Sequence, residues 1–161
     1  MSDEIRVGIA DVNVTKSPNK LITVGLGSCI GITIYDKLKK NGGLLHIMLP
    51  DSTQFSNVTN PLKFADLGVP ILLKLILDMG SQKKDIVAKI AGGASMFNFS
   101  DKSMIMDIGN RNAIAVKKIL EELKIPLISE ETGGNKGRTV ILSTESGTVQ
   151  IRTVGLGIKE I

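Results

Sequence analysis

The sequence has almost none of the residues that bind transition metals or form disulfides. Its 161 residues include one cysteine, Cys29, and one histidine, His46. A single cysteine excludes an internal disulfide framework and any CxxC metal or redox motif. A single histidine excludes a histidine-rich zinc or di-iron centre, which leaves only carboxylate sites open. We therefore expect a protein that works without a metal or cofactor.

Aromatic residues are also scarce. They make up 3% of the chain and tryptophan is absent, so the core must be aliphatic. Hydrophobic residues at 42% and charged residues at 22% exclude a disordered chain, which would be poor in apolar residues. A chain of this length buries roughly 70% of its unfolded surface. We predict a single domain over residues 1–161.

The chain has no apolar run long enough to cross a bilayer. Its most apolar stretch, residues 67–77, contains Lys74 and is shorter than the ~20 residues that a spanning helix needs. The first ten residues lack the apolar core of a signal peptide. The net charge is +4, but the basic residues are scattered, and their densest cluster, residues 37–40, falls on a predicted turn. We expect a cytoplasmic protein that neither inserts into membranes nor binds nucleic acid.

Hydrophobic periodicity predicts several strands and two main helices. Helices are predicted over residues 61–79, where Asn60-Pro61 is a capped start and Pro70 predicts a kink near residues 66–68, and over residues 112–124. Strands are predicted over residues 5–9, 21–26, 29–35, 44–49, 85–91, 125–129, 139–143 and 149–154. This pattern indicates an α+β domain in which helices cover a sheet layer.

Two glycine-rich segments, residues 25–31 and 133–139, superficially resemble phosphate-binding loops. Neither has the spacing of a dinucleotide or phosphate loop, and a strand rather than a helix follows the first. We interpret both as tight turns.

Cys29 is a candidate nucleophile because it begins a strand directly after a glycine turn. Backbone N–H groups left free in such a turn can hold an oxyanion, and a thiol nucleophile needs an adjacent base. His46 lies on the other arm of the predicted hairpin, within cross-strand reach if the register allows. The alternative is that Cys29 is a small buried hydrophobe and His46 a satisfied core residue. Composition and spacing leave both interpretations open.

Longer motifs resemble the CheD family, the chemoreceptor glutamine deamidases of bacterial and archaeal chemotaxis. Two carry the candidate residues: Thr23-Val-Gly-Leu-Gly-Ser-Cys29-Ile-Gly and His46-Ile-Met-Leu-Pro-Asp51. Further matches follow in order, at Lys63-Phe-Ala-Asp66, Lys89-Ile-Ala-Gly-Gly-Ala-Ser-Met-Phe97, Ile108-Gly-Asn-Arg-Asn112 and Thr132-Gly-Gly-Asn-Lys-Gly-Arg138. The segment 95–107 looks longer than is usual for the family.

The resemblance implies a fold and a set of site residues. The fold is an α/β sandwich with mixed, largely antiparallel sheet layers and two main helices, similar to toxin glutamine deamidase domains. Cys29 is implied as the nucleophile, His46 as the base and acid, and Thr23 as the third polar member. Gly27 and Ser28 would form the turn that supports the oxyanion.

The resemblance also implies a reaction and partners. The reaction converts glutamine side chains of methyl-accepting chemotaxis receptors to glutamate by thioester chemistry, with release of ammonia. The same machinery is compatible with hydrolysis of a receptor glutamyl methyl ester. The phosphatase CheC is an implied partner.

Other functions and roles stay open. The chain is alternatively a non-enzymatic chemotaxis adaptor that binds CheC, or a cysteine acyltransferase or peptidase that uses the same two side chains. Arg111 is a minor candidate for substrate contact, and Asn112 beside it is interpreted as an ordinary helix cap. Phe97 is interpreted as a core residue in preference to a partner contact.

Overall fold

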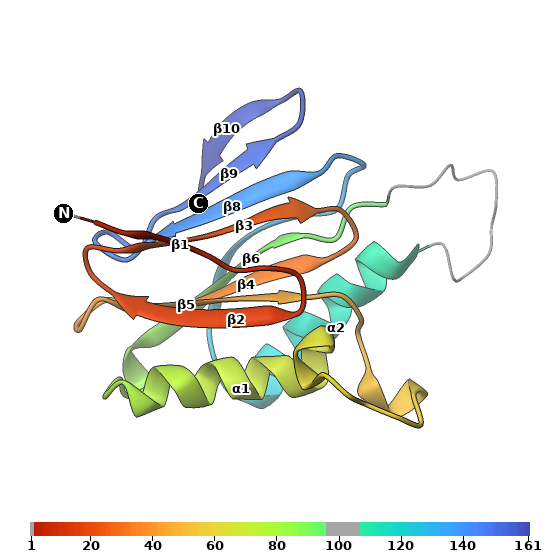
Figure 1. The fold of residues 1–161 in the computed structure, drawn as a ribbon, viewed down its shortest axis with the longest axis horizontal. Helices are drawn as coiled ribbons and strands as arrows, with labels where there is room; N and C mark the ends of the chain where they lie inside the picture. The colour runs from red at the N-terminus through yellow and green to blue at the C-terminus, as the bar shows by residue number, and fades with distance from the viewer. Residues whose placement is uncertain (1, 96–106) are drawn as a thin grey trace.

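The structure, a computed structural model, describes residues 2–95 and 107–161. Within these residues ten strands form two five-stranded sheets, and two α-helices pack on one of them (Figure 1). Sheet A has the strand order β1-β3-β8-β9-β10, with the bounds β1 Glu4–Arg6, β3 Lys20–Leu26, β8 Arg138–Ser143, β9 Val149–Thr153 and β10 Gly157–Glu160. Sheet B has the order β2-β5-β4-β6-β7, with the bounds β2 Asp11–Lys16, β5 Asn41–Ile47, β4 Ile30–Asp36, β6 Ile86–Gly92 and β7 Leu127–Thr132.

Both sheets are mixed but largely antiparallel. The pairs β1/β3 and β6/β7 are parallel, and the other neighbouring pairs run antiparallel. Helix α1 spans Ala65–Asp78 and α2 spans Ile108–Glu122, and the short 3₁₀ turns are η1 Ser52–Gln54, η2 Pro61–Lys63 and η3 Lys83–Asp85. The predicted α+β class, with two main helices on largely antiparallel sheets, is confirmed.

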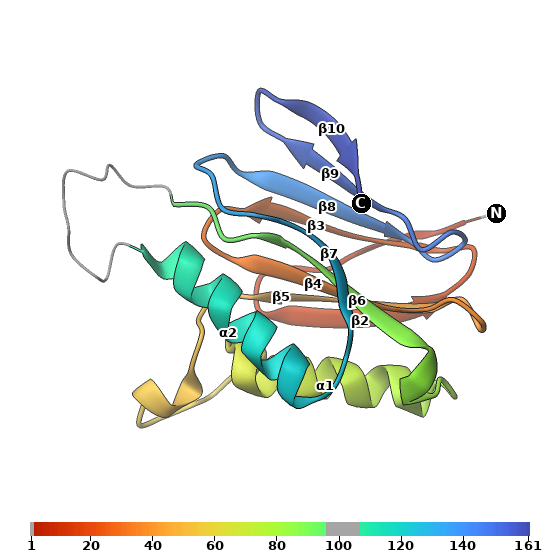
Figure 2. The ribbon, with the colours of Figure 1, turned by 180° about the vertical axis from the view of Figure 1, so that it is seen from behind.

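The layers are sheet A, sheet B and helices, in that order (Figures 1 and 2). Alternation along β4 shows why: Ile30, Ile32 and Ile34 are fully buried against the helices, and the residues between them face sheet A. On β5, Leu44 belongs instead to the apolar cluster between the two sheets. Sheet B is therefore buried on both faces, and any polar group on its inner face lies inside the sandwich.

The first predicted helix is interrupted. The Asn60 side chain accepts from the Leu62 N–H at 3.0 Å, as expected of a cap, but only the short turn η2 follows. Phe64 is extended because it forms a β-bridge with Leu49, and α1 begins after it at Ala65. The chain thus breaks at Phe64, and α1 then continues without interruption through residues 66–68 and Pro70.

Two strands and two further boundaries differ from prediction. The strands β2 and β10 were not predicted, and the strand expected over residues 5–9 ends at Arg6, with Ile9 59% exposed. Helix α2 begins at Ile108, earlier than the predicted start. The segment 96–106, which includes Phe97, lies outside the described residues. No helix in the described part of the chain is both long and apolar enough to span a bilayer.

Candidate active site

Strand alternation places Thr23 between the sheets, on the same face of β3 as Leu21, and an irregularity in the strand follows it. Thr23 pairs with Val140 and Leu26 pairs with Arg138, so β3 has one more residue than β8 between these two pairs. Gly25 lies within this bulge and has a φ of +75°, a conformation that favours glycine. A bulge bends its strand and redirects side chains. Thr23 is fully buried here, at the end of sheet A where the motif turns toward Cys29.

The Thr23 hydroxyl joins sheet A to His46 on sheet B. Its Oγ lies 2.7 Å from Nδ1 of His46 and donates to the Val7 carbonyl at 2.8 Å. A hydroxyl has only one proton, and here the Val7 carbonyl accepts it. The imidazole Nδ1 must therefore carry a proton that it donates to Thr23. This fixes the tautomer of His46, with a lone pair on Nε2.

Nε2 of His46 is a buried base. The side chain is 0% exposed, and no polar atom of the described residues is hydrogen-bonded to Nε2. Burial lowers the pKa of His46 from 6.5 to about 4, because the charged form loses hydration there. Near neutral pH the imidazole is consequently neutral, with Nε2 ready to accept a proton.

The register of β4 and β5 places Cys29 near this base. Gly31 pairs with His46, so Cys29, two residues before Gly31, lies on the same face at the diagonal position. Gly31 has no side chain, and a Cβ there would come within 3.6 Å of the Thr23 Cγ2 atom. The tightest contact of such a Cβ would be with the Leu26 Cδ1 atom at 3.2 Å, so glycine suits the close packing of β4 against β3 here. No hydrogen bond joins Cys29 to His46 in this state.

The turn before β4 has its carbonyls anchored, and two of its amides have no oxygen acceptor among the described residues. All three carbonyls of residues 27–29 accept hydrogen bonds: Gly27 O from Ala94 N at 2.8 Å, Ser28 O from Asn112 Nδ2 at 2.9 Å and Cys29 O from Gly93 N at 2.8 Å. The Gly27 N–H donates within the turn to the Gly25 carbonyl at 3.1 Å. Within residues 2–95 and 107–161, no oxygen accepts from the N–H groups of Ser28 and Cys29. These two amides are available to a bound oxygen.

The Cys29 thiol is half-buried and packs against the apolar cluster between the sheets. Burial raises the pKa of this thiol above its ordinary value, and the backbone N–H of the same residue opposes the rise. Thiol and imidazole are therefore both neutral near neutral pH.

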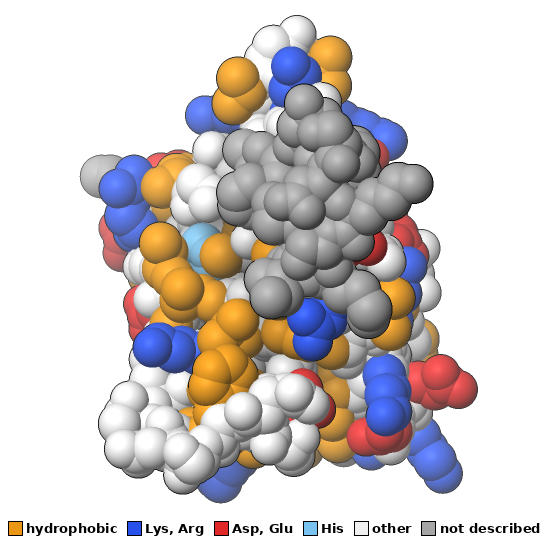
Figure 3. All heavy atoms as spheres, turned by 90° about the vertical axis from the view of Figure 1, so that its right-hand side faces the viewer, with side chains coloured by type: hydrophobic (Ala, Val, Ile, Leu, Met, Phe, Trp, Pro, Cys, Tyr) orange, Lys and Arg blue, Asp and Glu red, His pale blue; other side chains and the backbone are white. Residues whose placement is uncertain are grey.

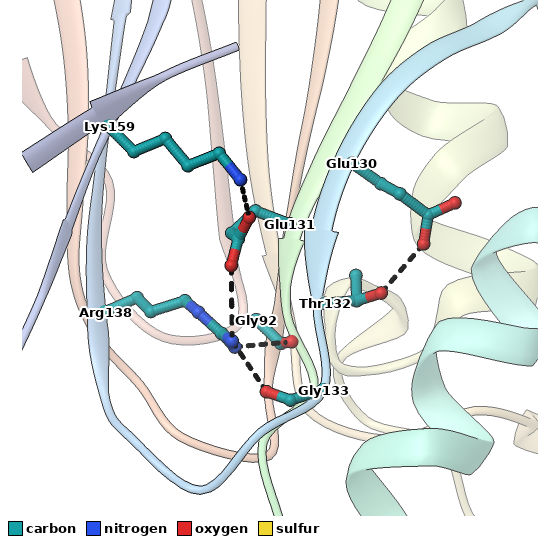
Figure 4. A network of polar contacts seen from close by, with 7 residues as sticks. All are labelled: Gly92, Glu130, Glu131, Thr132, Gly133, Arg138 and Lys159. Atoms are coloured by element: carbon teal, nitrogen blue, oxygen red, sulfur yellow. Dashed lines mark hydrogen bonds and ion pairs between the residues drawn. The ribbon is translucent and has the colours of Figure 1, made fainter. Parts of the chain in front are cut away.

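A buried arginine supports the backbone behind Cys29 (Figure 4). Arg138 is 6% exposed, and its guanidinium donates to the Gly92 carbonyl at 2.8 Å and to the Gly133 carbonyl at 2.6 Å. The Glu131 carboxylate lies 4.0 Å from Arg138 and binds Lys159 at 2.6 Å. Burial lowers the pKa of Arg138, and the Glu131 charge partly offsets this.

Gly92, whose carbonyl binds Arg138, lies directly against the turn that contains Cys29. Its φ is +117°, and a Cβ at Gly92 would collide with the Cys29 carbonyl oxygen. The neighbouring Gly93 N–H is the donor to that same carbonyl. The close approach of the two backbones explains why glycine occupies position 92.

Asn112 is a residue whose role the sequence interpretation missed. It is fully buried at the fifth position of α2, so it is not a helix cap. Its Nδ2 donates to the carbonyls of Ser28 and Met48, at 2.9 Å each. The signal in the sequence was an asparagine within an otherwise apolar helix face. The two carbonyl groups that accept its hydrogen bonds belong to residues far away in the chain.

The end of the sandwich where these strands meet carries hydrophobic side chains around the histidine (Figure 3). The imidazole is visible between them, although water does not reach it. Arg111 lines a separate groove with Asp51 and Lys118, between α2 and the segment after β5. The structure thus brings Thr23 and His46 into contact and places Cys29 beside them, whereas Arg111 is not part of this group.

A family profile and curated relatives match the chain. The profile described as CheD chemotactic sensory transduction matches residues 48–153. A protein of Clostridium novyi (strain NT) named "Probable chemoreceptor glutamine deamidase CheD" is 71% identical over 159 residues, which cover 99% of this chain and 98% of that protein. A protein of the same name from Clostridium kluyveri is 68% identical over 158 residues, covering 98% of each chain.

Among solved structures, the Bacillus licheniformis hypothetical protein YfiH is similar, with a TM-score of 0.50 and 15% sequence identity. The match covers 78% of this chain and 51% of that one, so this chain spans about half the length of the YfiH structure. At this identity the likeness concerns the fold alone.

Proposed function

The chain belongs to the CheD family, and from that premise we propose that it is a protein-glutamine deamidase that acts on chemotaxis receptors. The names of the curated relatives support the activity and the receptor substrate. The observation that carries the chemistry is the fixed tautomer of His46, whose Nε2 is buried and unpaired on the sheet face that Cys29 shares. We further propose that residues 1–161 act as one domain.

In the first half of the reaction, Sγ of Cys29 attacks the carboxamide carbon of a receptor glutamine. As the S–C bond forms, Nε2 of His46 takes the thiol proton, and the carbonyl oxygen becomes an oxyanion. The free N–H groups of Ser28 and Cys29 are the donors offered to this oxyanion. The imidazolium then gives its proton to the departing nitrogen, and the C–N bond breaks with release of ammonia.

In the second half, water hydrolyses the glutamyl thioester. Nε2 accepts a proton from the water as its oxygen attacks the thioester carbon, and the proton returns to sulfur as the S–C bond breaks. The products are a glutamate side chain and the free thiol. A glutamyl methyl ester would follow the same steps with methanol as the leaving group.

Thr23 acts through the imidazole. Its Oγ accepts the Nδ1 proton, which keeps Nε2 unprotonated and holds the ring in place. When the ring becomes an imidazolium, the same hydroxyl oxygen and the Val7 carbonyl behind it form a dipole chain that stabilises the charge. We assign Thr23 an orienting role, and Gly27 the role of turn support.

CheC stays a predicted partner without an assigned surface. The rival functions make different products: an adaptor leaves receptor glutamines unchanged, and a peptidase creates new chain termini.

The test is mass spectrometry of a receptor cytoplasmic fragment incubated with the protein. We expect conversion of specific glutamines to glutamates with an intact backbone, and no conversion by Cys29→Ala. The exposed Ser146, on the remote β8–β9 turn, provides the control variant Ser146→Ala, which should convert normally. Turnover by Cys29→Ala would contradict the thioester route, and cleaved peptides would favour the peptidase.

A further inference from the structure

We propose that Asn112 is a positioning residue for this reaction: it sets the separation between the strand ends that carry Cys29 and His46. This inference rests on the proposed deamidase function and adds a residue outside the Thr23, His46 and Cys29 group. It starts from the two hydrogen bonds that the buried Asn112 amide donates.

The backbone ladder between β4 and β5 ends before it reaches Cys29. Its last pair is Ile30 and Ile47, and the next pair in the same register would be Cys29 and Met48. That pair is not joined, because the Met48 N–H donates to the Lys63 carbonyl at 2.8 Å and the Cys29 carbonyl accepts from Gly93. Cys29 therefore lies beyond the last ladder pair and has no direct backbone bond to β5, whereas His46 lies within the ladder opposite Gly31.

Asn112 bridges the strands at this point. One nitrogen, Nδ2, donates to the carbonyls of Ser28 and Met48 at 2.9 Å each, so it ties the residue before the thiol to the strand that carries the base. A primary amide is well suited to this, because its two N–H groups share a single nitrogen. Helix α2 supplies a rigid support for the amide.

The orientation of the amide is unambiguous. Rotating it by 180° would place Oδ1 against two carbonyl oxygens, so Nδ2 must face them. Oδ1 has no hydrogen-bond partner among the described residues, although Asn112 is 0% exposed. A buried unpaired oxygen is unfavourable, as is asparagine in a helix interior. The residue is thus poorly suited to stability alone, and its two donated bonds are its distinctive contribution.

The expected effect concerns geometry more than binding. Cys29 is adjacent to Ser28, and Met48 is two residues beyond His46, so loss of the bridge allows the thiol and Nε2 to drift apart. A misplacement of about 1 Å between reacting groups lowers rates on the order of 100-fold. Substrate contacts elsewhere on the surface would not change.

The experiment compares Asn112→Leu with Val116→Ala by receptor-fragment deamidation, thermal melting and alkylation of Cys29 with iodoacetamide. Leucine keeps the branched shape of asparagine, although its side chain is larger, and it removes both donors. Val116 is fully buried one helical turn further along α2, in the apolar cluster between sheet B and the helices. Val116→Ala therefore disturbs the same helix without affecting a hydrogen bond to the strand ends. If Asn112→Leu does not fold, Asn112→Ala replaces it, because alanine favours the helix and leaves room for water at both carbonyls.

We expect Asn112→Leu to lower kcat on the order of 10- to 100-fold with little change in KM, at temperatures where every variant is folded. Alkylation of Cys29 should become faster at the same time, because the loosened loop exposes the thiol. Val116→Ala should lower the melting temperature and leave kcat within a few-fold of the parent. A reactive thiol combined with slow turnover marks a nucleophile that is present but misplaced.

Equal kcat values for Asn112→Leu and Val116→Ala would overturn this inference while leaving the deamidase proposal intact. A parent protein that alkylates normally but never converts receptor glutamines would instead overturn the proposed function, and the role of Asn112 with it.

Discussion

Thr23 connects three parts of the chain through one hydroxyl. It donates to the Val7 carbonyl and accepts from His46, so both its proton and a lone pair are in use. A valine would fill the same space and suit a strand equally well. The hydroxyl is therefore the part of the residue that the site requires.

We expect Thr23→Ser to keep most of the deamidase activity and Thr23→Val to lose it by on the order of 10- to 100-fold, since the imidazole then loses its orienting acceptor. Thr23→Val should also be less stable by about 1–3 kcal/mol, because it leaves the Nδ1 proton buried without a partner. Steady-state kinetics and urea unfolding measure the two effects. A fully active Thr23→Val enzyme would show that only the shape of Thr23 matters.

At the scale of elements, the site depends on one close backbone contact. The end of β6 lies against the turn before β4, where Gly92 leaves no room for a side chain beside the Cys29 carbonyl. This contact and the hydrogen bond from Gly93 set where β4 starts.

We expect Gly92→Ala to destabilise the protein by at least about 1–3 kcal/mol and to lower activity at least 10-fold, because strain at positive φ combines with a collision at the Cys29 carbonyl. Gly80→Ala is the matched control. Gly80 has a φ of +100° and open space around it, so this variant should lose stability but keep kcat. Similar kcat values for the two variants would show that the contact does not position the thiol.

Elements with a clear apolar pattern were predictable from the sequence, and two of the edge strands were not. The strands β3, β4 and β8 follow from alternation or from continuous apolar runs, and their predicted positions hold to within a few residues. The strand β2 has only two valines, Val12 and Val14, between polar residues along an edge of sheet B, and β10 is exposed throughout with one apolar residue, so in each the apolar pattern is too short to reveal a strand.

The break at Phe64 and the bridge from Asn112 depend on partners distant in the sequence, which local patterns do not encode. For the site itself, motif resemblance predicted Thr23, Cys29 and His46. The structure adds the hydrogen bond between Thr23 and His46 and shows which of its two atoms carries the proton. Their catalytic roles stay predictions.

At the scale of the whole molecule, the buried neutral histidine couples folding to pH. The pKa of His46 is lowered from 6.5 to about 4 in the folded chain, so between these values the unfolded chain binds a proton that the folded chain does not. Acid therefore favours unfolding. The contribution of His46 to the free energy of unfolding is fully present above pH 6.5 and declines as the pH falls toward 4.

We expect the free energy of unfolding to drop by about 3 kcal/mol from this one group between pH 6.5 and pH 4, from a shift of roughly 2.5 units at about 1.4 kcal/mol each. Urea titrations at a series of pH values measure this slope. His46→Gln, which does not titrate, should be less stable at neutral pH but show a flatter dependence over that interval. If the free energy of unfolding depended on pH equally in the parent and in His46→Gln, burial would not be keeping the imidazole neutral.

The bond between Thr23 and His46 also has a mechanical meaning, because the hydroxyl belongs to one sheet and the base to the other. The two layers are held together mainly by aliphatic side chains, which tolerate small displacements, whereas a hydrogen bond weakens within roughly half an ångström. The tautomer of His46 therefore depends on the position of one sheet relative to the other. On the proposed mechanism, shear between the two sheets would lower activity without any change at the sulfur atom.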